Sequence, residues 1–90
     1  MKIVWRRRAE HAFLQQLDFV RARNQRAAER LQVAVENRME LLALYPEMGT
    51  LSRNPSVREL IIARTPYVAV YQIDGDVITI LQFFHTSQDR

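Results

Sequence analysis

The chain has 90 residues, of which 48% are hydrophobic, and its 13 basic residues outnumber the 10 acidic ones. This length predicts one domain over residues 1–90, and the apolar content excludes a disordered tail. Small secreted domains usually need disulfides, and this chain has no cysteine, so we expect it in the reducing cytoplasm. No segment approaches the roughly 20 apolar residues that span a bilayer, so we expect no membrane association. The net charge of +3 favours an acidic partner, either protein or nucleic acid.

The start of the sequence predicts a strand and then a helix. Residues 2–5, with the sequence KIVW, are apolar and β-prone. From Ala9 onward, Phe13, Leu17 and Val20 recur at helical spacing and predict a first helix. We interpret the three arginines at positions 6–8 as a solvated turn into this helix, and they could also hold an acidic partner.

A second helix is predicted directly after the first. Asn24 is suited to cap it, because an asparagine side chain accepts a hydrogen bond from an orphan amide two or three residues on. Pro46 disfavours helical geometry at the residue before it, so the helix should end near Tyr45. The stripe expected to face the core comprises Ala28, Leu31, Val35, Met39 and Leu42. So few residues join the two helices that we expect an antiparallel hairpin.

The second half of the sequence predicts a loop and three strands. Residues 46–56 are rich in Pro, Gly, Ser and Asn, which is typical of a loop. Strands are predicted at residues 57–62, 67–73 and 77–84, with a tight hairpin at Asp74-Gly75-Asp76. The strand at 67–73 is apolar on both alternating faces and should lie in the middle of the sheet. The order β-α-α-β-β-β predicts an α+β fold, with the helix hairpin packed on one face of a mainly antiparallel sheet.

Few residues point to chemistry. His11 and His85 are far apart and have no ligand spacing around them, so we expect no metal site. There is no glycine-rich phosphate loop, and we expect no cofactor.

Four residues are candidates for RNA cleavage or for recognition of a target surface: Arg58, Arg64, Tyr67 and His85. A metal-free ribonuclease needs a base, an acid and cations. His85 has a suitable unperturbed pKa for either proton transfer, and Arg58 and Arg64 could supply the charge. Alternatively, His85 is a structural residue at a strand end, Arg58 forms a surface pair with Glu59, and Tyr67 belongs to the core.

Six short motifs follow one another along nearly the whole chain: KIVW, NQRAA, LALYPEMG, VREL, PYVAVY and ILQFFH. In this order they resemble the RelE/ParE superfamily of small bacterial toxins from type II toxin–antitoxin systems. RelE-like members cut messenger RNA on the ribosome, whereas ParE-like members poison DNA gyrase.

The choice between these branches depends on one strand position and on the residues that follow the last strand. The nuclease branch typically carries an arginine inside the strand where this chain has Val68, and it tends to have a basic and aromatic tail. Here the residues after His85 contain no tyrosine, and Arg90 is their only basic residue. The resemblance is therefore closer to the ParE branch, which implies a gyrase inhibitor that is not an enzyme. The alternative is a RelE-like, metal-independent endoribonuclease using Arg58, Arg64 and His85. On the ParE reading, His85 closes the sheet.

The resemblance also implies a cognate, ParD-like antitoxin that neutralises the toxin in a hetero-oligomer. We expect its flexible C-terminal segment to fold onto the helix hairpin. Arginines on both helices and apolar residues outside the core stripes support this expectation, because such clusters mark partner surfaces. An acidic amphipathic helix would suit them, although singly scattered apolar residues are also ordinary. The expected antitoxin-binding residues are Leu14, Phe19, Arg21, Arg26, Arg30 and Val33.

Overall fold

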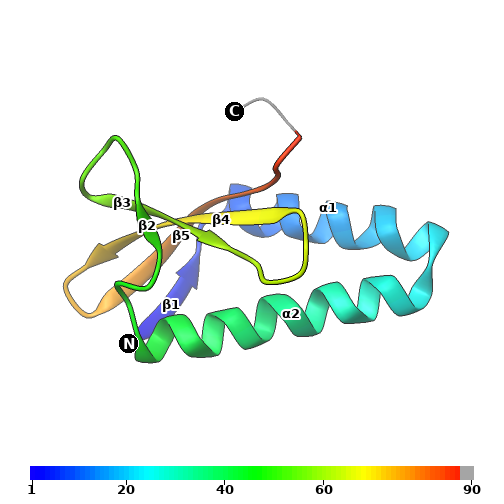
Figure 1. Ribbon diagram of the computed structural model, residues 1–90, viewed down its shortest axis with the longest axis horizontal. Coiled ribbons are helices and arrows are strands. Elements are labelled where there is room, and N and C mark those ends of the chain that lie inside the picture. The colour runs from blue at the N-terminus through cyan, green and yellow to red at the C-terminus, as the bar shows by residue number, and fades with distance from the viewer. Residues whose placement is uncertain (88–90) are drawn as a thin grey trace.

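A computed structural model describes residues 1–87; residues 88–90, with Arg90 among them, lie outside the described part. The described residues form two helices and a five-stranded sheet (Figure 1). The elements are β1 (Lys2–Trp5), α1 (Arg7–Arg23), α2 (Gln25–Leu44), β2 (Thr50–Leu51), β3 (Val57–Ile61), β4 (Tyr67–Asp74) and β5 (Val77–His85). Neither helix has a stretch apolar enough to cross a membrane.

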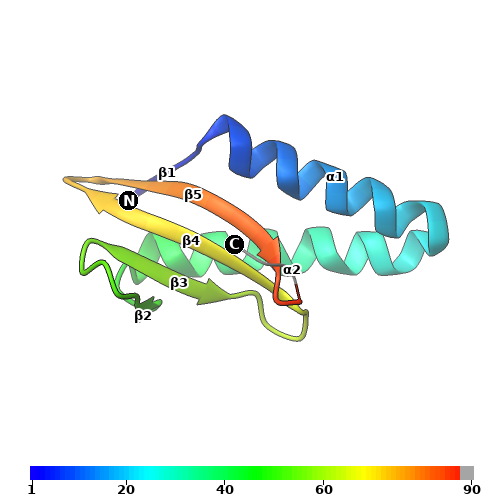
Figure 2. The same cartoon turned by 90° about the horizontal axis from the view of Figure 1, so that it is seen from above.

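The strands are arranged in the order β1-β5-β4-β3-β2. β1 pairs with β5 in parallel, and the other neighbours pair antiparallel. The views from the front and from above place the helices on one side of this sheet, with α2 beneath β3 and β4 (Figures 1 and 2). The predicted α+β class, with a helix pair on one face of a mainly antiparallel sheet, is confirmed.

β4 is the middle strand, as its two apolar faces predicted. The core between the sheet and the helices includes Tyr67, Ala69 and Tyr71 from this strand. Val68 and Val70 point to the opposite face, because side chains alternate along a strand, and each is only 6% exposed. Both faces of β4 are therefore buried, although the helices cover only one.

The helices meet at a single linking residue, Asn24. Its side chain accepts a hydrogen bond from the Ala27 amide at 3.0 Å, so the predicted cap is confirmed. The expected turn at residues 6–8 is wrong, because α1 already begins at Arg7. The Glu10 amide donates to the Arg6 carbonyl at 3.0 Å, and arginine is a good helix former, so the first helical turn includes these basic residues.

The loop predicted at residues 46–56 contains a short strand that sequence periodicity did not indicate. Thr50 and Leu51 form β2 and pair with Glu59 and Arg58 of β3. Two residues are too few to display an alternating pattern, which explains why β2 was missed. The other predicted strands are confirmed to within one residue at each end.

β5 contains a bulge that changes which side chains face the core. Val70 is opposite Gln82 and Tyr71 is opposite Ile80, so Leu81 is an extra residue in the ladder. Because of it, both Ile80 and Phe83 are buried in the core despite their odd spacing.

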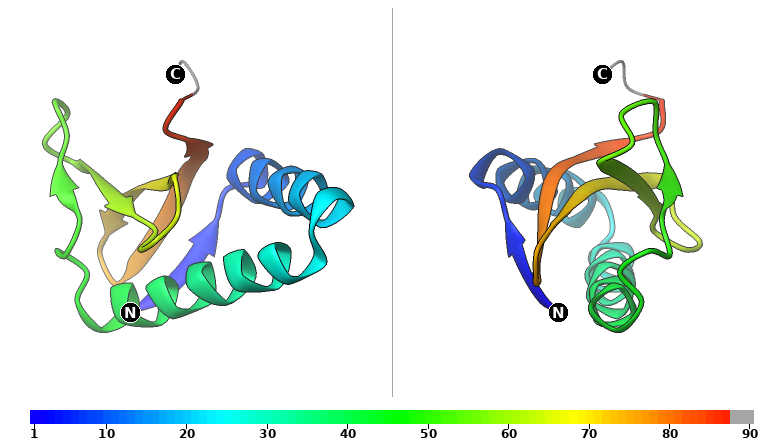
Figure 3. Two further views of the ribbon diagram at one scale, coloured as in Figure 1. Left: turned by 45° about the vertical axis from the view of Figure 1, so that its right-hand side comes forward. Right: turned by 90° about the vertical axis from the view of Figure 1, so that its left-hand side faces the viewer.

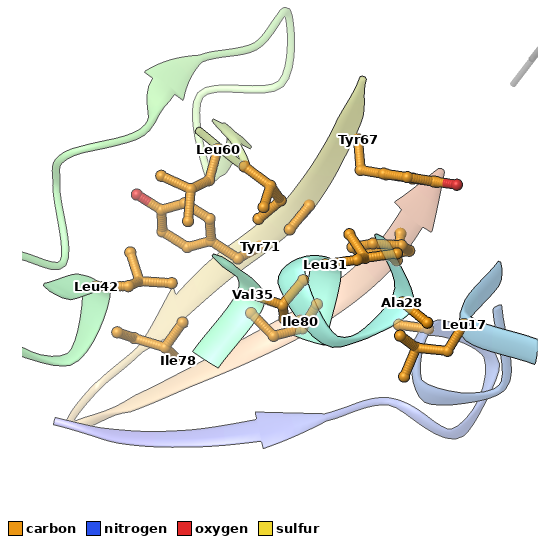
Figure 4. Close-up of a cluster of buried hydrophobic side chains, with 14 residues drawn as sticks. Leu17, Ala28, Leu31, Val35, Leu42, Leu60, Tyr67, Tyr71, Ile78 and Ile80 are labelled. Atoms are coloured by element: carbon orange, nitrogen blue, oxygen red, sulfur yellow. The ribbon is translucent and has the colours of Figure 1, made fainter. Parts of the chain in front are cut away.

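The core lies between the sheet and the helices (Figure 4). At one end it is aromatic: the ring centroids of Trp5 and Phe13 are 5.5 Å apart, and those of Phe13 and Phe83 are 5.2 Å apart. Tyr67 stacks on Phe83 at 5.2 Å. These contacts join β1, α1, β4 and β5.

At the other end of the core, Tyr71 anchors the turn that follows α2. Its hydroxyl donates to the Pro46 carbonyl at 2.7 Å and accepts from the Gly49 amide at 2.9 Å. A Cβ atom at position 49 would lie 2.6 Å from the Tyr71 ring, so only glycine fits without displacing it. The Pro-x-x-Gly motif is thus explained by its packing against the central strand.

We expect Tyr71→Phe to destabilise the protein by about 1–3 kcal/mol, because the buried Gly49 amide would lose its acceptor. Urea unfolding should show a lower midpoint with an unchanged slope. Tyr45→Phe is the matched control, because Tyr45 is 62% exposed. Equal stability of the two variants would contradict an anchoring role for Tyr71.

Candidate partner-binding grooves

A groove opens between α2 and the segment that joins β3 to β4; we call it the helix-side groove. Its volume is about 1230 Å³. The end of α1 contributes Val20, α2 contributes Leu31, Val33 and Leu41, and Pro66 closes the other wall. These apolar side chains make the groove suitable for an amphipathic segment of another protein.

The helix-side groove is also positively charged. Of the described residues, four arginines line it, Arg26, Arg30, Arg38 and Arg64, and Glu29 is the one carboxylate. The Nε of Arg38 is buried and has no hydrogen-bond partner within the described part of the chain. An unpaired buried donor costs free energy, so a carboxylate from a partner would be favoured here.

A second, smaller groove of about 520 Å³ lies on the face of the sheet opposite the helices; we call it the sheet-side groove. Arg6 and Arg8 line it at the start of α1, and Arg53 lines it from the loop between β2 and β3. Val70 and Gln82 belong to its floor. Sequence reasoning missed this site, because its two basic edges are far apart in the chain.

Only half of the expected antitoxin-binding residues come together in one groove. Arg26, Arg30 and Val33 line the helix-side groove, whereas Leu14, Phe19 and Arg21 do not. Leu14 and Phe19 are about 50% and 55% exposed, respectively. Five helical residues correspond to a rotation of about 140°, so they lie on different sides of α1. Leu14 and Phe19 therefore do not share one face of α1.

Two of the α1 residues have local partners. Arg21 pairs with Asp18 at 3.1 Å. The Arg23 guanidinium lies 3.7 Å from the centroid of the Phe19 ring and donates to the Phe19 carbonyl at 3.0 Å. Phe19 is thus partly covered by its own helix.

Arg58 contributes to the fold. Its Nη1 donates to the carbonyls of Glu47 and Gly49, at 3.1 and 2.8 Å. It therefore helps Tyr71 to hold the Pro46–Gly49 turn, and this guanidinium is already engaged by backbone oxygens.

Tyr67 is buried, in agreement with the core interpretation, and its hydroxyl donates to Gln16 Oε1 at 3.0 Å. Burial raises the pKa of its phenol above the ordinary value of 10.0, so the group is protonated at neutral pH. It is therefore unsuited to act as a general base there.

His85 is the last residue of β5 and pairs with Tyr67 in the sheet register. Its ring meets the Tyr67 ring edge-on, with centroids 5.2 Å apart. The Ser87 amide donates to Nδ1 at 3.1 Å. In this bond Nδ1 is the acceptor.

The three candidate catalytic residues do not form one constellation. Arg58 is opposite Tyr71, and His85 is opposite Tyr67, four residues away along β4. At about 3.3 Å per residue this separates them by roughly 13 Å along the strand. Arg64 has a positive φ of 64° in the turn before β4 and lines the helix-side groove. Within residues 1–87, no three His, Asp or Glu side chains gather closely enough to hold a metal ion.

The structure thus carries two grooves lined by arginines, and comparison with known proteins places the chain in a family. Over 94% of its length the chain superposes on 95% of a chain from the chromosomal ParDE toxin–antitoxin system of P. aeruginosa. The TM-score is 0.80 and the sequence identity 23%, so this likeness concerns the fold alone.

Sequence similarity then gives the family. Residues 3–90 match the sequence model described as "ParE toxin of type II toxin-antitoxin system, parDE". The chain is also 39% identical over 62 residues to Y4kP, a candidate toxin of Sinorhizobium fredii. That match covers 69% of this chain and 64% of the relative, which is less than two thirds of the relative's length. The chain belongs to the ParE toxin family of type II toxin–antitoxin systems.

We expect Tyr67 and Tyr71 to reduce stability at alkaline pH. Burial is the largest effect on both phenols and raises their pKa; at Tyr71 the Gly49 amide and Arg58 act in the opposite direction. Because the folded pKa exceeds the unfolded one, stability is fully present below pH 10 and is lost as pH rises through the folded pKa values. Urea unfolding between pH 8 and about 11 should show a shallower decline for Tyr67→Phe. The same decline in variant and wild type would contradict this burial effect.

Proposed function

We propose that this ParE-family protein inhibits DNA gyrase and is not a nuclease. The environment of Val68 is the main support for this proposal. This residue stands where nuclease-type members of the superfamily typically carry a strand arginine, and it is a buried, neutral side chain in the central strand. A valine cannot stabilise the negative charge that develops on a phosphorane. Arg58, which could otherwise supply charge, is engaged by two backbone carbonyls.

Purified toxin should therefore inhibit supercoiling by gyrase in a concentration-dependent manner and leave messenger RNA intact. The measurement is plasmid supercoiling by gyrase in vitro, together with mapping of messenger-RNA ends after induction in cells. The matched variant is His85→Ala, which should retain gyrase inhibition. Normal supercoiling at saturating toxin would contradict the proposal. Cleaved messenger RNA that disappears in His85→Ala would instead support a ribosome-dependent endonuclease.

We further propose that the helix-side groove receives the antitoxin. Its apolar wall on α2 would accept the apolar side of an amphipathic helix, and Val33 is 53% exposed there and Leu41 40%. The arginines around this wall would pair with carboxylates on the same helix. Arg38 supplies the most specific support, because its buried Nε lacks a partner in the free toxin.

The double variant Val33→Ser/Leu41→Ser should weaken antitoxin binding by at least about tenfold, because two apolar contacts are lost. Titration calorimetry measures the affinity, and circular dichroism checks that the fold is native. Leu14→Ser/Phe19→Ser is the matched comparison, because neither side chain lines the groove. A loss in that variant as well would mean that the antitoxin continues around α1. Unchanged affinity of Val33→Ser/Leu41→Ser would rule out the helix-side groove.

A further inference from the structure

The amino-terminal end of α1 carries three arginines, which is electrostatically unfavourable for a helix. Arg6 is its N-cap residue, Arg7 and Arg8 follow, no side chain caps the first turn, and Glu10 is the one acidic residue in that turn. The amino-terminal end of a helix carries a partial positive charge, so cations there are unfavourable and anions are favourable. α2, by contrast, begins with a capping asparagine. Local choices that oppose stability are expected at functional sites.

Two of these arginines face a third across the sheet-side groove. Arg6 and Arg8 belong to α1, whereas Arg53 lies in the loop between β2 and β3. Figure 3 (right) shows the start of α1 and this loop at opposite edges of the sheet. The groove is thus a trough with cationic side chains on both edges, and its volume is about 520 Å³.

The composition of the lining indicates the kind of anion. Besides the arginines, the groove is lined by Ser52, Asn54 and Gln82, and Glu59 is the one carboxylate that residues 1–87 contribute to this lining. Arginine with serine, asparagine and glutamine is the set that bonds phosphate oxygens in nucleic-acid complexes. No aromatic ring lines the groove, so bases have no platform for stacking and the contacts are with the backbone.

We propose that the sheet-side groove binds the phosphodiester backbone of DNA through Arg6, Arg8 and Arg53. The contact is independent of sequence, and it lies on the opposite side of β4 from the helix-side groove. It goes beyond the proposed inhibition of gyrase, since DNA binding by the isolated protein requires no gyrase. The unfavourable charges at the start of α1 are explained, because phosphate groups would neutralise them.

The test is binding of a short fluorescent DNA duplex, measured by anisotropy across a series of salt concentrations. Wild type is compared with Arg6→Ser/Arg8→Ser/Arg53→Ser. Loss of three phosphate contacts should weaken binding at low salt by at least about tenfold and reduce the slope of log K against log salt by about 2 to 3. The variant should melt at the same temperature or higher, because serine is a better N-cap than arginine and two cations leave the helix start.

Lys2→Ser/Arg21→Ser/Arg23→Ser is the control for net charge, because it removes the same charge outside both grooves. We expect it to retain most of the affinity and the salt slope. Equal losses in the two triple variants, or no binding of DNA by wild type, would overturn the proposal. A labelled polyglutamate that binds as tightly as DNA, with the same dependence on the three arginines, would also overturn it and assign the groove to an acidic protein.

Discussion

The central strand β4 is buried on both of its faces. The helices cover Tyr67, Ala69 and Tyr71, and Val68 and Val70 on the opposite face are also buried, each with 6% exposure. Neither α1 nor α2 lies on that second face (Figure 3), where Val70 lines the sheet-side groove together with residues of the loop between β2 and β3. A central strand covered in two different ways leaves a groove on each side of the sheet. One is mainly apolar with a charged margin, and the other has two cationic edges.

Tyr71 connects this buried strand to the most recognisable motif of the sequence. Its hydroxyl and the Arg58 guanidinium together satisfy backbone groups at Pro46, Glu47 and Gly49. The Pro-x-x-Gly segment, the arginine of β3 and the tyrosine of β4 therefore form one structural unit. A residue type that is suited to catalysis or recognition is here used for the fold, which shows why a charged residue in a motif need not be functional.

The sequence was informative wherever the periodicity was long and the cause local. The two helices, the central position of β4 and the Asn24 cap were all predictable from spacing and from capping chemistry. The start of α1, the two-residue strand β2 and the bulge at Leu81 were not, because none of them is marked by a repeating pattern. Exposed residues such as Leu14 and Val33 were recognised from the core stripes. Which of them share a surface depends on how each helix is rotated against its neighbours. Likewise, Arg6 and Arg53 line the same groove only because the sheet brings their segments to one face.

Amide chemical-shift mapping by NMR would show whether two partners bind on opposite sides of β4. Labelled toxin would be titrated separately with its cognate antitoxin and with a short DNA duplex. We expect the antitoxin to shift amide signals of α2 and of the turn before β4, around Val33, Leu41 and Arg64. We expect DNA to shift those of the start of α1 and of the loop around Arg53. Perturbation of the same residues by both ligands would contradict binding on opposite sides of β4.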